Sequence, residues 1–120
     1  MQNFRKLLVW KQGIEIAIKT YQLTETLPSK EKFGLTSQMT RAAVSIPSNI
    51  AEGSGRKSAK EFHHYLQIAL GSAFELETQV IVVGRLNLIS QEQKDQLKQL
   101  IVDEQKMING LVRRGKIASL

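Results

Sequence analysis

The chain has 120 residues, enough for one ordinary domain with a buried core that needs neither disulfides nor a metal. It contains no cysteine, which excludes disulfide frameworks, thiol catalysis and the usual zinc fingers. The formal net charge is +6 and the pI is about 9.8, an excess that favours nucleic acid or an acidic protein as a partner.

The N-terminus lacks the long apolar core of a signal peptide. No uninterrupted apolar run approaches the ~20 residues that a membrane-spanning helix needs. Together with the absence of cysteine, these features predict a soluble, cytoplasmic protein with no membrane partner.

A first helix is predicted over about residues 8–27. Its apolar positions recur in alternating steps of three and four, which is typical of one face of a helix: Leu7, Trp10, Ile14, Ala17, Tyr21 and Thr24. Pro28 ends the pattern because it lacks a backbone N–H and restricts the residue before it. The connection that follows is short, so the next helix is expected to run antiparallel.

A second helix is predicted over about residues 36–53, with Thr36 or Ser37 as its cap. Its apolar face comprises Leu35, Met39, Ala42, Ala43, Ile46, Ile50 and Gly53. Pro47 lies in the middle, where it must kink or break a helix. A kink is the better prediction, because the apolar phase continues across it. Gly53 or Gly55 is expected to end the helix in the left-handed conformation.

A third helix is predicted over about residues 58–86, because Ser58 and Glu61 have the spacing of a capping box. Its stripe of Phe62, Leu66, Ala69, Ala73, Leu76, Val80 and Val83 keeps a period of about 3.5, which favours left-handed, nearly parallel packing. A second apolar row of Leu70, Phe74 and Ile81 lies beside it. One bundle would not cover both rows, so the second row predicts self-association.

A fourth helix is predicted over about residues 90–114, with Ser90 and Gln93 as another capping pair. Its apolar positions are Leu97, Leu100, Ile101, Met107, Ile108, Leu111 and Val112. No repeat or strand pattern interrupts the series. The sequence therefore predicts a single all-α domain over residues 1–120, an antiparallel up-down-up-down four-helix bundle that is left-handed.

The sequence contains little that indicates a catalytic site or a cofactor site. Residues 53–58 end like a phosphate-binding loop, but that motif follows a buried strand and here a helix precedes it. A weaker alternative is a phosphate held at the start of the third helix beside Arg56 and Lys57. His63 and His64 are adjacent, so they point about 100° apart and cannot both face one metal ion. We expect no metal and no other cofactor.

Polar side chains form two rows on the second and third helices. Arg41, Ser45, Ser48 or Asn49, and Glu52 make one row, and Glu61, Ser72, Glu75 and Gln79 make the other. We interpret them as residues that satisfy one another across a helix or subunit interface, with Arg41 pairing with Glu75 or Glu77. The alternative is an active site that uses the carboxylates.

The positive charge is expected to lie at one end of the bundle. If consecutive helices alternate in direction, that end holds nine of the 17 basic residues: Arg5, Lys6, Lys11, Arg56, Lys57, Lys60, Arg113, Arg114 and Lys116. Only Glu52 and Glu61 oppose them, a local net charge of +7, whereas the rest of the chain has eight basic and nine acidic residues. Such an end favours contacts with nucleic-acid phosphates. Aromatic residues for base stacking are scarce there.

The stretch from Arg41 to Arg56, with Glu61-Phe62, Gly71-Ser72 and Glu75-Leu-Glu77, resembles the four-helix-bundle proteins encoded in intervening sequences of bacterial 23S ribosomal RNA genes. These are similar to the accessory variability determinant proteins of diversity-generating retroelements. The resemblance implies a homopentameric ring that binds nucleic acid and partners a reverse transcriptase. The matching positions are Arg41, Ser45, Asn49, Glu52, Gly53, Gly55, Arg56, Glu61, Phe62, Gly71, Ser72, Glu75 and Glu77.

The sequence and the resemblance together predict a non-enzymatic basic bundle that assembles with itself and binds nucleic acid, RNA rather than DNA, through phosphates. One alternative is an oligomeric scaffold that binds only protein. The other is an enzyme that uses the carboxylates of Glu52, Glu75 and Glu77.

Overall fold

A computed structural model describes residues 3–118 of the chain, with side chains described as far as residue 114. These residues form four long helices and no strand, so the prediction of an all-α fold is confirmed. The helices are α1 (Leu8–Thr24), α2 (Leu35–Ser54), α3 (Ala59–Arg85) and α4 (Gln91–Ala118). Short 3-10 helices at Phe4–Lys6 and Ser29–Glu31 precede α1 and α2.

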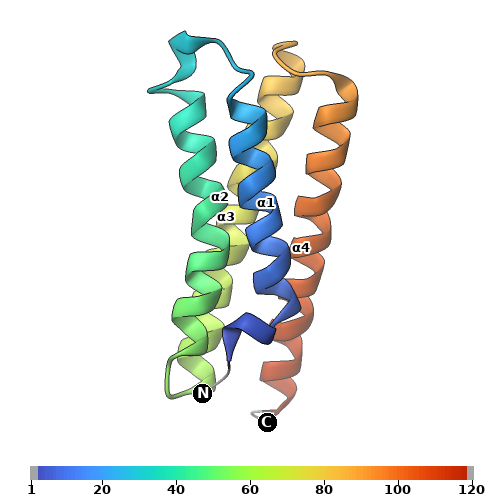
Figure 1. Ribbon diagram of the computed structural model, residues 1–120. Coiled ribbons are helices and arrows are strands. Elements are labelled where there is room, and N and C mark those ends of the chain that lie inside the picture. Colours follow the sequence, from blue (N-terminus) through green and yellow to red (C-terminus); the bar gives the residue numbers. More distant parts are fainter. Residues whose placement is uncertain (1–2, 119–120) are drawn as a thin grey trace.

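Figure 1 shows consecutive helices running in opposite directions along an elongated molecule of 48 × 22 × 20 Å. Helix α1 packs against α2 and α4, and α3 packs against the same two helices from the other side of the bundle. The start of α1, the α2–α3 turn and the end of α4 consequently lie at one end of the molecule. The left-handed sense of the bundle stays a prediction.

The core is formed by side chains from all four helices. Helices α2 and α3 bury the apolar faces that the sequence predicts, apart from Leu35 and Phe62, which are partly exposed. The largest apolar side chains that are fully buried are Ile16, Met39, Ile46, Ile50, Leu76, Ile101 and Ile108. Contact between these side chains is what holds the four helices together.

The prediction of the buried face of α1 was wrong: the observed face is rotated about the helix axis by about one residue from the predicted one. The buried positions are Val9, Gly13, Ile16, Ala17, Thr20, Leu23 and Thr24, whereas Trp10 is only partly buried and Tyr21 is 51% exposed. Thr20 is tolerated in the core because its hydroxyl donates to the Ile16 carbonyl at 2.7 Å. A face that contains glycine and threonine does not stand out in a search for apolar side chains. The helix ends at Thr24, three residues before the predicted end.

Helix α2 differs from its prediction at both ends. It begins at Leu35 with Gly34 in the cap position and no capping side chain, so Thr36 and Ser37 lie within its first turn. At the other end Gly55 has a φ of −86°, and no described glycine adopts a left-handed conformation. The helix continues through Pro47, so the chain does not break there.

Glycine is required at residue 53 for a different reason. A Cβ atom on Gly53 would lie 2.5 Å from the Cβ of Tyr65 and 3.0 Å from the ring of Phe62. Because a real Cβ cannot approach so closely, any side chain at residue 53 would push α2 and α3 apart. Gly53 therefore sets the distance between the two helices next to the α2–α3 turn.

Side-chain caps begin α3 and α4. The Ser58 hydroxyl accepts from the Glu61 N–H at 3.1 Å, as predicted. Within the described residues, the Glu61 carboxylate does not accept from the Ser58 N–H in return. Before α4 the box is reciprocal: the Gln93 N–H donates to the Ser90 hydroxyl at 3.1 Å, and the Ser90 N–H donates to the Gln93 side-chain carbonyl at 2.8 Å. Helix α4 then extends to Ala118, beyond the predicted end at residue 114.

The second apolar row of α3 is more covered than expected. Leu70 belongs to the core and Ile81 is partly buried, whereas Phe74 remains 49% exposed. The bundle therefore covers two of the three residues of this row at least in part.

Although the sequence has no uninterrupted apolar run of membrane-spanning length, α3 is long and apolar enough as a whole to cross a membrane. This observation is weak evidence for a membrane span, because the core helix of a water-soluble bundle has the same length and composition. The apolar stripe of α3 is buried against the other helices of the bundle.

Substitutions at two glycines test whether the close packing of α2 against α3 requires glycine at residue 53. Replacing Gly53 with Ala should destabilise the protein by about 1–3 kcal/mol, because the new methyl group overpacks the contact with Tyr65. Replacing Gly71 with Ala is the matched control: it also lies within a helix, but its Cβ would meet nothing within 4 Å, so the change should stabilise by up to about 1 kcal/mol. Urea unfolding of both variants measures the difference. Equal effects of the same sign would contradict the proposed close contact.

Candidate functional site

The predicted basic end exists as a set of exposed side chains. Arg5 and Lys6 precede α1, Arg56 and Lys57 occupy the α2–α3 turn, and Lys11, Lys60, Arg113 and Arg114 lie on the adjoining helix ends. All eight are exposed, and alternating helix directions bring their segments to the same end (Figure 1). The side chain of Lys116, the ninth predicted residue, lies outside the described residues.

Arg56 is held more firmly than the others. Its guanidinium forms an ion pair with Glu52, donates to the Tyr65 hydroxyl at 2.8 Å and lies 5.0 Å from the centre of the Tyr65 ring. These neighbours, Tyr65 first and Glu52 with it, raise the pKa of Arg56 above its ordinary value. Glu52 offsets part of the local positive charge, so Arg56 contributes less to this end than a free cation would.

The aromatic residues near the basic end are occupied by contacts within the chain. The ring of Phe4 packs edge-on against Trp10 with centroids 5.2 Å apart, and the guanidinium of Arg5 lies 4.4 Å from the Phe4 ring. Tyr65 is engaged by Arg56 and, edge-on, by His64. This end therefore offers charges for phosphates rather than free aromatic faces for bases.

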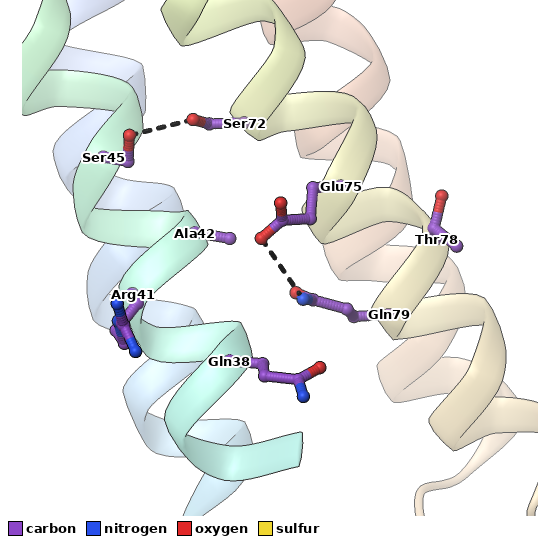
Figure 2. A pocket seen from close by; sticks show the side chains of 8 residues that line it. All are labelled: Gln38, Arg41, Ala42, Ser45, Ser72, Glu75, Thr78 and Gln79. Carbon is purple, nitrogen blue, oxygen red and sulfur yellow. Dashed lines mark hydrogen bonds between the residues drawn. The ribbon is translucent and has the colours of Figure 1, made fainter. Parts of the chain in front are cut away.

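The polar rows of α2 and α3 meet in a groove on the surface between these helices. The groove has a volume of about 840 Å³ and is lined by Gln38, Arg41, Ala42, Ser45, Ser72, Glu75, Thr78 and Gln79 (Figure 2). The Ser45 and Ser72 hydroxyls lie 2.8 Å apart, and the Asn49 amide donates to the Ser45 hydroxyl at 2.9 Å. The serines and the asparagine thus link the rows, as the sequence suggested.

The predicted pairing of Arg41 within the chain is wrong. Neither Glu75 nor Glu77 forms an ion pair with it in the described part of the structure, and Figure 2 shows Arg41 pointing away from Glu75. Glu77 lies toward α4 instead, where its carboxylate accepts from the Gln105 side chain at 2.7 Å. Glu75 is the acceptor for Gln79 at 3.5 Å. Residues two positions apart on a helix point to different sides, so one arginine cannot face both carboxylates.

The same geometry separates the carboxylates of the enzyme alternative. Glu52 pairs with Arg56, Glu75 lies in the α2–α3 groove, and Glu77 bonds to α4. Because general acid and base catalysis needs groups that reach one substrate, these three residues do not form a common site. Among the residues that the structure describes, no group of three or more His, Asp and Glu side chains could hold a metal ion.

A buried carboxyl that the sequence prediction passed over lies in the core. Glu104 on α4 is fully buried, and neither oxygen of its side chain has a hydrogen-bond partner. Its Oε2 would lie 3.3 Å from a Cβ on Gly13 of α1. Burial raises the pKa of Glu104 to about 8, so the carboxyl is neutral at neutral pH.

The spacing of α4 contains the signal that could have found Glu104. Leu97, Ile101, Glu104, Ile108 and Val112 follow one another in steps of three or four and are all buried. A reading that counts only apolar residues skips the third member of this row. The same spacing rule, applied without regard to residue type, would have placed a carboxylic acid in the core.

The comparisons with known proteins agree with this fold. The sequence profile of a family described as 23S rRNA-intervening sequence protein matches residues 5–110. The chain belongs to the 23S rRNA-intervening sequence protein family. The resemblance inferred from Arg41–Arg56 and the glutamates of α3 is therefore confirmed.

This family member is also similar to a crystal structure, at 1.70 Å resolution, of a protein of unknown function from the S23 ribosomal protein family of Bacteroides thetaiotaomicron VPI-5482. The two share 26% sequence identity with a TM-score of 0.82, over 88% of this chain and 98% of the other. Of the curated proteins compared with the chain, none matches. Neither the family nor the solved neighbour indicates a class of enzyme.

The buried carboxyl predicts a dependence of stability on pH. Between the ordinary pKa of 4.5 and about 8 the folded chain retains a proton that the unfolded chain releases. The free energy of unfolding should therefore fall as pH rises, by up to about 1.4 kcal/mol per unit. Glu104→Gln should remove most of this slope, because the amide keeps the shape and cannot ionise.

Urea unfolding at about pH 5.5 and about pH 8.5 measures this effect. Glu92→Gln is the control, since Glu92 is an exposed carboxylate on the same helix and should leave the slope unchanged. A slope that survives in Glu104→Gln would mean that another group is responsible.

Proposed function

We propose that this protein is a non-enzymatic, cytoplasmic nucleic-acid-binding protein that assembles with itself. Its basic end contacts the phosphates of RNA. The observation that carries the proposal is the gathering of eight exposed basic side chains at one end of the bundle, contributed by the segment before α1, the α2–α3 turn, and helices α1, α3 and α4. Each cation that neutralises a phosphate releases counterions from the nucleic acid, so such a cluster gives affinity without reading sequence.

The surroundings of the cluster favour contact with the phosphate backbone of the nucleic acid over recognition of its bases at most of this surface. Phe4 and Tyr65, two aromatic residues near the cluster, already contact charged or aromatic neighbours of the chain. Family membership favours RNA over DNA, because the family description names 23S rRNA.

Self-association has support from apolar side chains left exposed along α3. Ile68, Phe74 and Val82 are large apolar side chains and are each at least 39% exposed. The sequence resemblance favours a homopentamer, in which five basic ends would act together. A reverse transcriptase as a further partner is supported only by that resemblance.

A protein-only scaffold is the second candidate function. It is favoured by the α2–α3 groove, where Arg41 has no ion-pair partner within the described part of the chain and Gln79 has a buried carbonyl oxygen without a donor. A partner protein could supply both contacts. This candidate predicts no affinity for nucleic acid that depends on salt.

Binding of single-stranded RNA should weaken steeply with salt, with a log–log slope of about −0.7 for each phosphate contacted. Replacing Lys57, Lys60 and Arg113 with Gln should flatten the slope and weaken binding to all sequences alike. The control replaces Lys19, Lys30 and Lys32, which are exposed toward the opposite end, and should change little. Fluorescence anisotropy titrations measure both.

Equal losses from the two triple variants would show that binding is not confined to the basic end. Undetectable binding of RNA and DNA by the unmodified protein at ~50 mM salt would remove the nucleic-acid proposal and leave the scaffold.

Light scattering tests the assembly. The unmodified protein should have the mass of an oligomer at micromolar concentration, and Phe74→Glu should shift it toward the monomer with unchanged helical content, because a carboxylate would be buried without a partner. Leu86→Glu is the control, since Leu86 is equally apolar and 56% exposed but lies at the α3–α4 turn. A monomer mass for the unmodified protein would refute self-association.

A further inference from the structure

A small pocket with an apolar floor lies within the basic end, between the start of α1 and the last turns of α4. Its volume is about 460 Å³, within the range of roughly 300–1,000 Å³ that is usual for small-molecule sites. We call it the α1–α4 pocket and define it by its lining: Lys6, Leu7, Leu8, Val9, Lys106, Met107, Gly110, Leu111 and Arg114. Only Lys6 and Arg114 belong to the basic residues predicted from the sequence.

The rim of the α1–α4 pocket is cationic. Lys6 comes from the segment before α1, and Lys106 and Arg114 come from α4, two turns apart. All three are exposed, and none forms an ion pair in the described part of the chain. No carboxylate lines the pocket. An anion at this rim would therefore meet three positive charges that the protein itself leaves unneutralised.

The floor of the pocket is apolar and accessible. Leu8 is 66% exposed, and Met107 and Leu111, which also line the pocket, are partly buried. A methionine thioether makes favourable contacts with aromatic rings, and leucine side chains pack on their faces. The floor thus suits a flat, unstacked ring better than it suits water.

Gly110 lines the pocket and has no side chain to fill it. A glycine within a helix costs about 1 kcal/mol relative to alanine, and close neighbours account for glycine at residues 13 and 53 but not at Gly71 of α3. At Gly110 an added Cβ would meet nothing within 4 Å, so the packing of the chain does not require glycine there. The missing side chain instead leaves the pocket open against the backbone of α4.

We propose that the α1–α4 pocket takes one unpaired nucleotide of a bound RNA. The base would lie on Leu8 and Met107 against Gly110, and its phosphate would contact Lys6, Lys106 and Arg114. The inference rests on the proposed function and deepens it, since the remaining cations of the basic end are placed to hold the neighbouring phosphates. A nucleotide within a perfect duplex keeps its base stacked and cannot enter, so the pocket selects single-stranded or frayed RNA.

Filling the pocket without changing its charge is the sharpest test. Gly110→Leu places an aliphatic side chain in the open space and also favours the helix, so the variant should fold. Its affinity for a short single-stranded RNA at fixed salt should fall about tenfold, the usual effect of losing one stacked base. Its affinity for a blunt-ended RNA duplex should not change. Asn109→Leu is the matched control, because it adds the same side chain at an exposed position of α4 outside the pocket.

The salt dependence of the affinity distinguishes the loss of the base contact from the loss of a phosphate contact. Gly110→Leu should keep the slope of the unmodified protein, because no phosphate contact is lost. Lys106→Gln should reduce the slope by about 0.7. Circular dichroism verifies that both variants retain their helices, and titration with uridine monophosphate, followed by changes in the NMR signals of Gly110 and Leu111, locates the site directly.

Four outcomes would overturn the inference. Gly110→Leu with unchanged affinity for single-stranded RNA, or with equal losses for single strand and duplex, would show that no base enters the pocket. Binding of phosphatidylglycerol vesicles that Gly110→Leu abolishes, with RNA affinity intact, would assign the pocket to an acyl chain. In these cases the phosphate contacts of the basic end still stand. Absence of any RNA binding by the unmodified protein would overturn the inference and the proposed function together.

Discussion

Three helices of the bundle meet at Gly13, where little room is left for a side chain. A Cβ atom on this glycine would lie 3.3 Å from the Pro47 ring of α2 and 3.3 Å from the Glu104 carboxyl of α4. A side chain at residue 13 would require the Pro47 ring or the Glu104 carboxyl to move by a few tenths of an ångström, so glycine favours this close approach of α1 to both neighbours. The glycine that weakens α1 as an isolated helix is what allows it to pack in the bundle, and a buried acid that must stay neutral accompanies it.

This contact links the interior of the bundle to its charged end. Once Gly13 is set against Pro47 and Glu104, the positions of α1, α2 and α4 along the bundle axis follow, because each helix rises 1.5 Å per residue. The basic residues near the chain's start, around the α2–α3 turn and late in α4 then lie at a common end. A concentrated positive field thus results from helix lengths and packing as much as from composition.

Helix α3 has two sides with different uses. On one side Glu77 reaches Gln105 of α4 and closes the bundle, while on the other Ser72 and Glu75 line the groove with α2. Ile68, Phe74 and Val82 stay exposed along its length. An assembly formed along α3 would leave the basic end and the α1–α4 pocket accessible, so the proposed self-association would not block the proposed RNA contacts.

The sequence by itself determined the helical elements, the buried faces of α2 and α3, the caps at Ser58 and Ser90, and family membership. These depend on local spacing, which the order of residues states directly. It also indicated which basic residues would share an end, since that depends only on alternating helix directions. The charge pattern led to the proposed RNA contacts, although it did not include Lys106.

Only the tertiary structure decided what depends on close approach between helices. The face of α1 was missed because Gly13 and Thr20 are buried through backbone contact and a hydrogen bond to the backbone, neither of which a count of apolar side chains detects. Arg41 and Glu75 share a groove without pairing, and Glu104 is buried without a partner. Spacing along a helix gives the direction of a side chain but not the distance to its neighbour. That distance is set by how the helices pack, and it determines whether charges pair, whether a carboxyl stays neutral and whether a glycine borders a contact or a pocket.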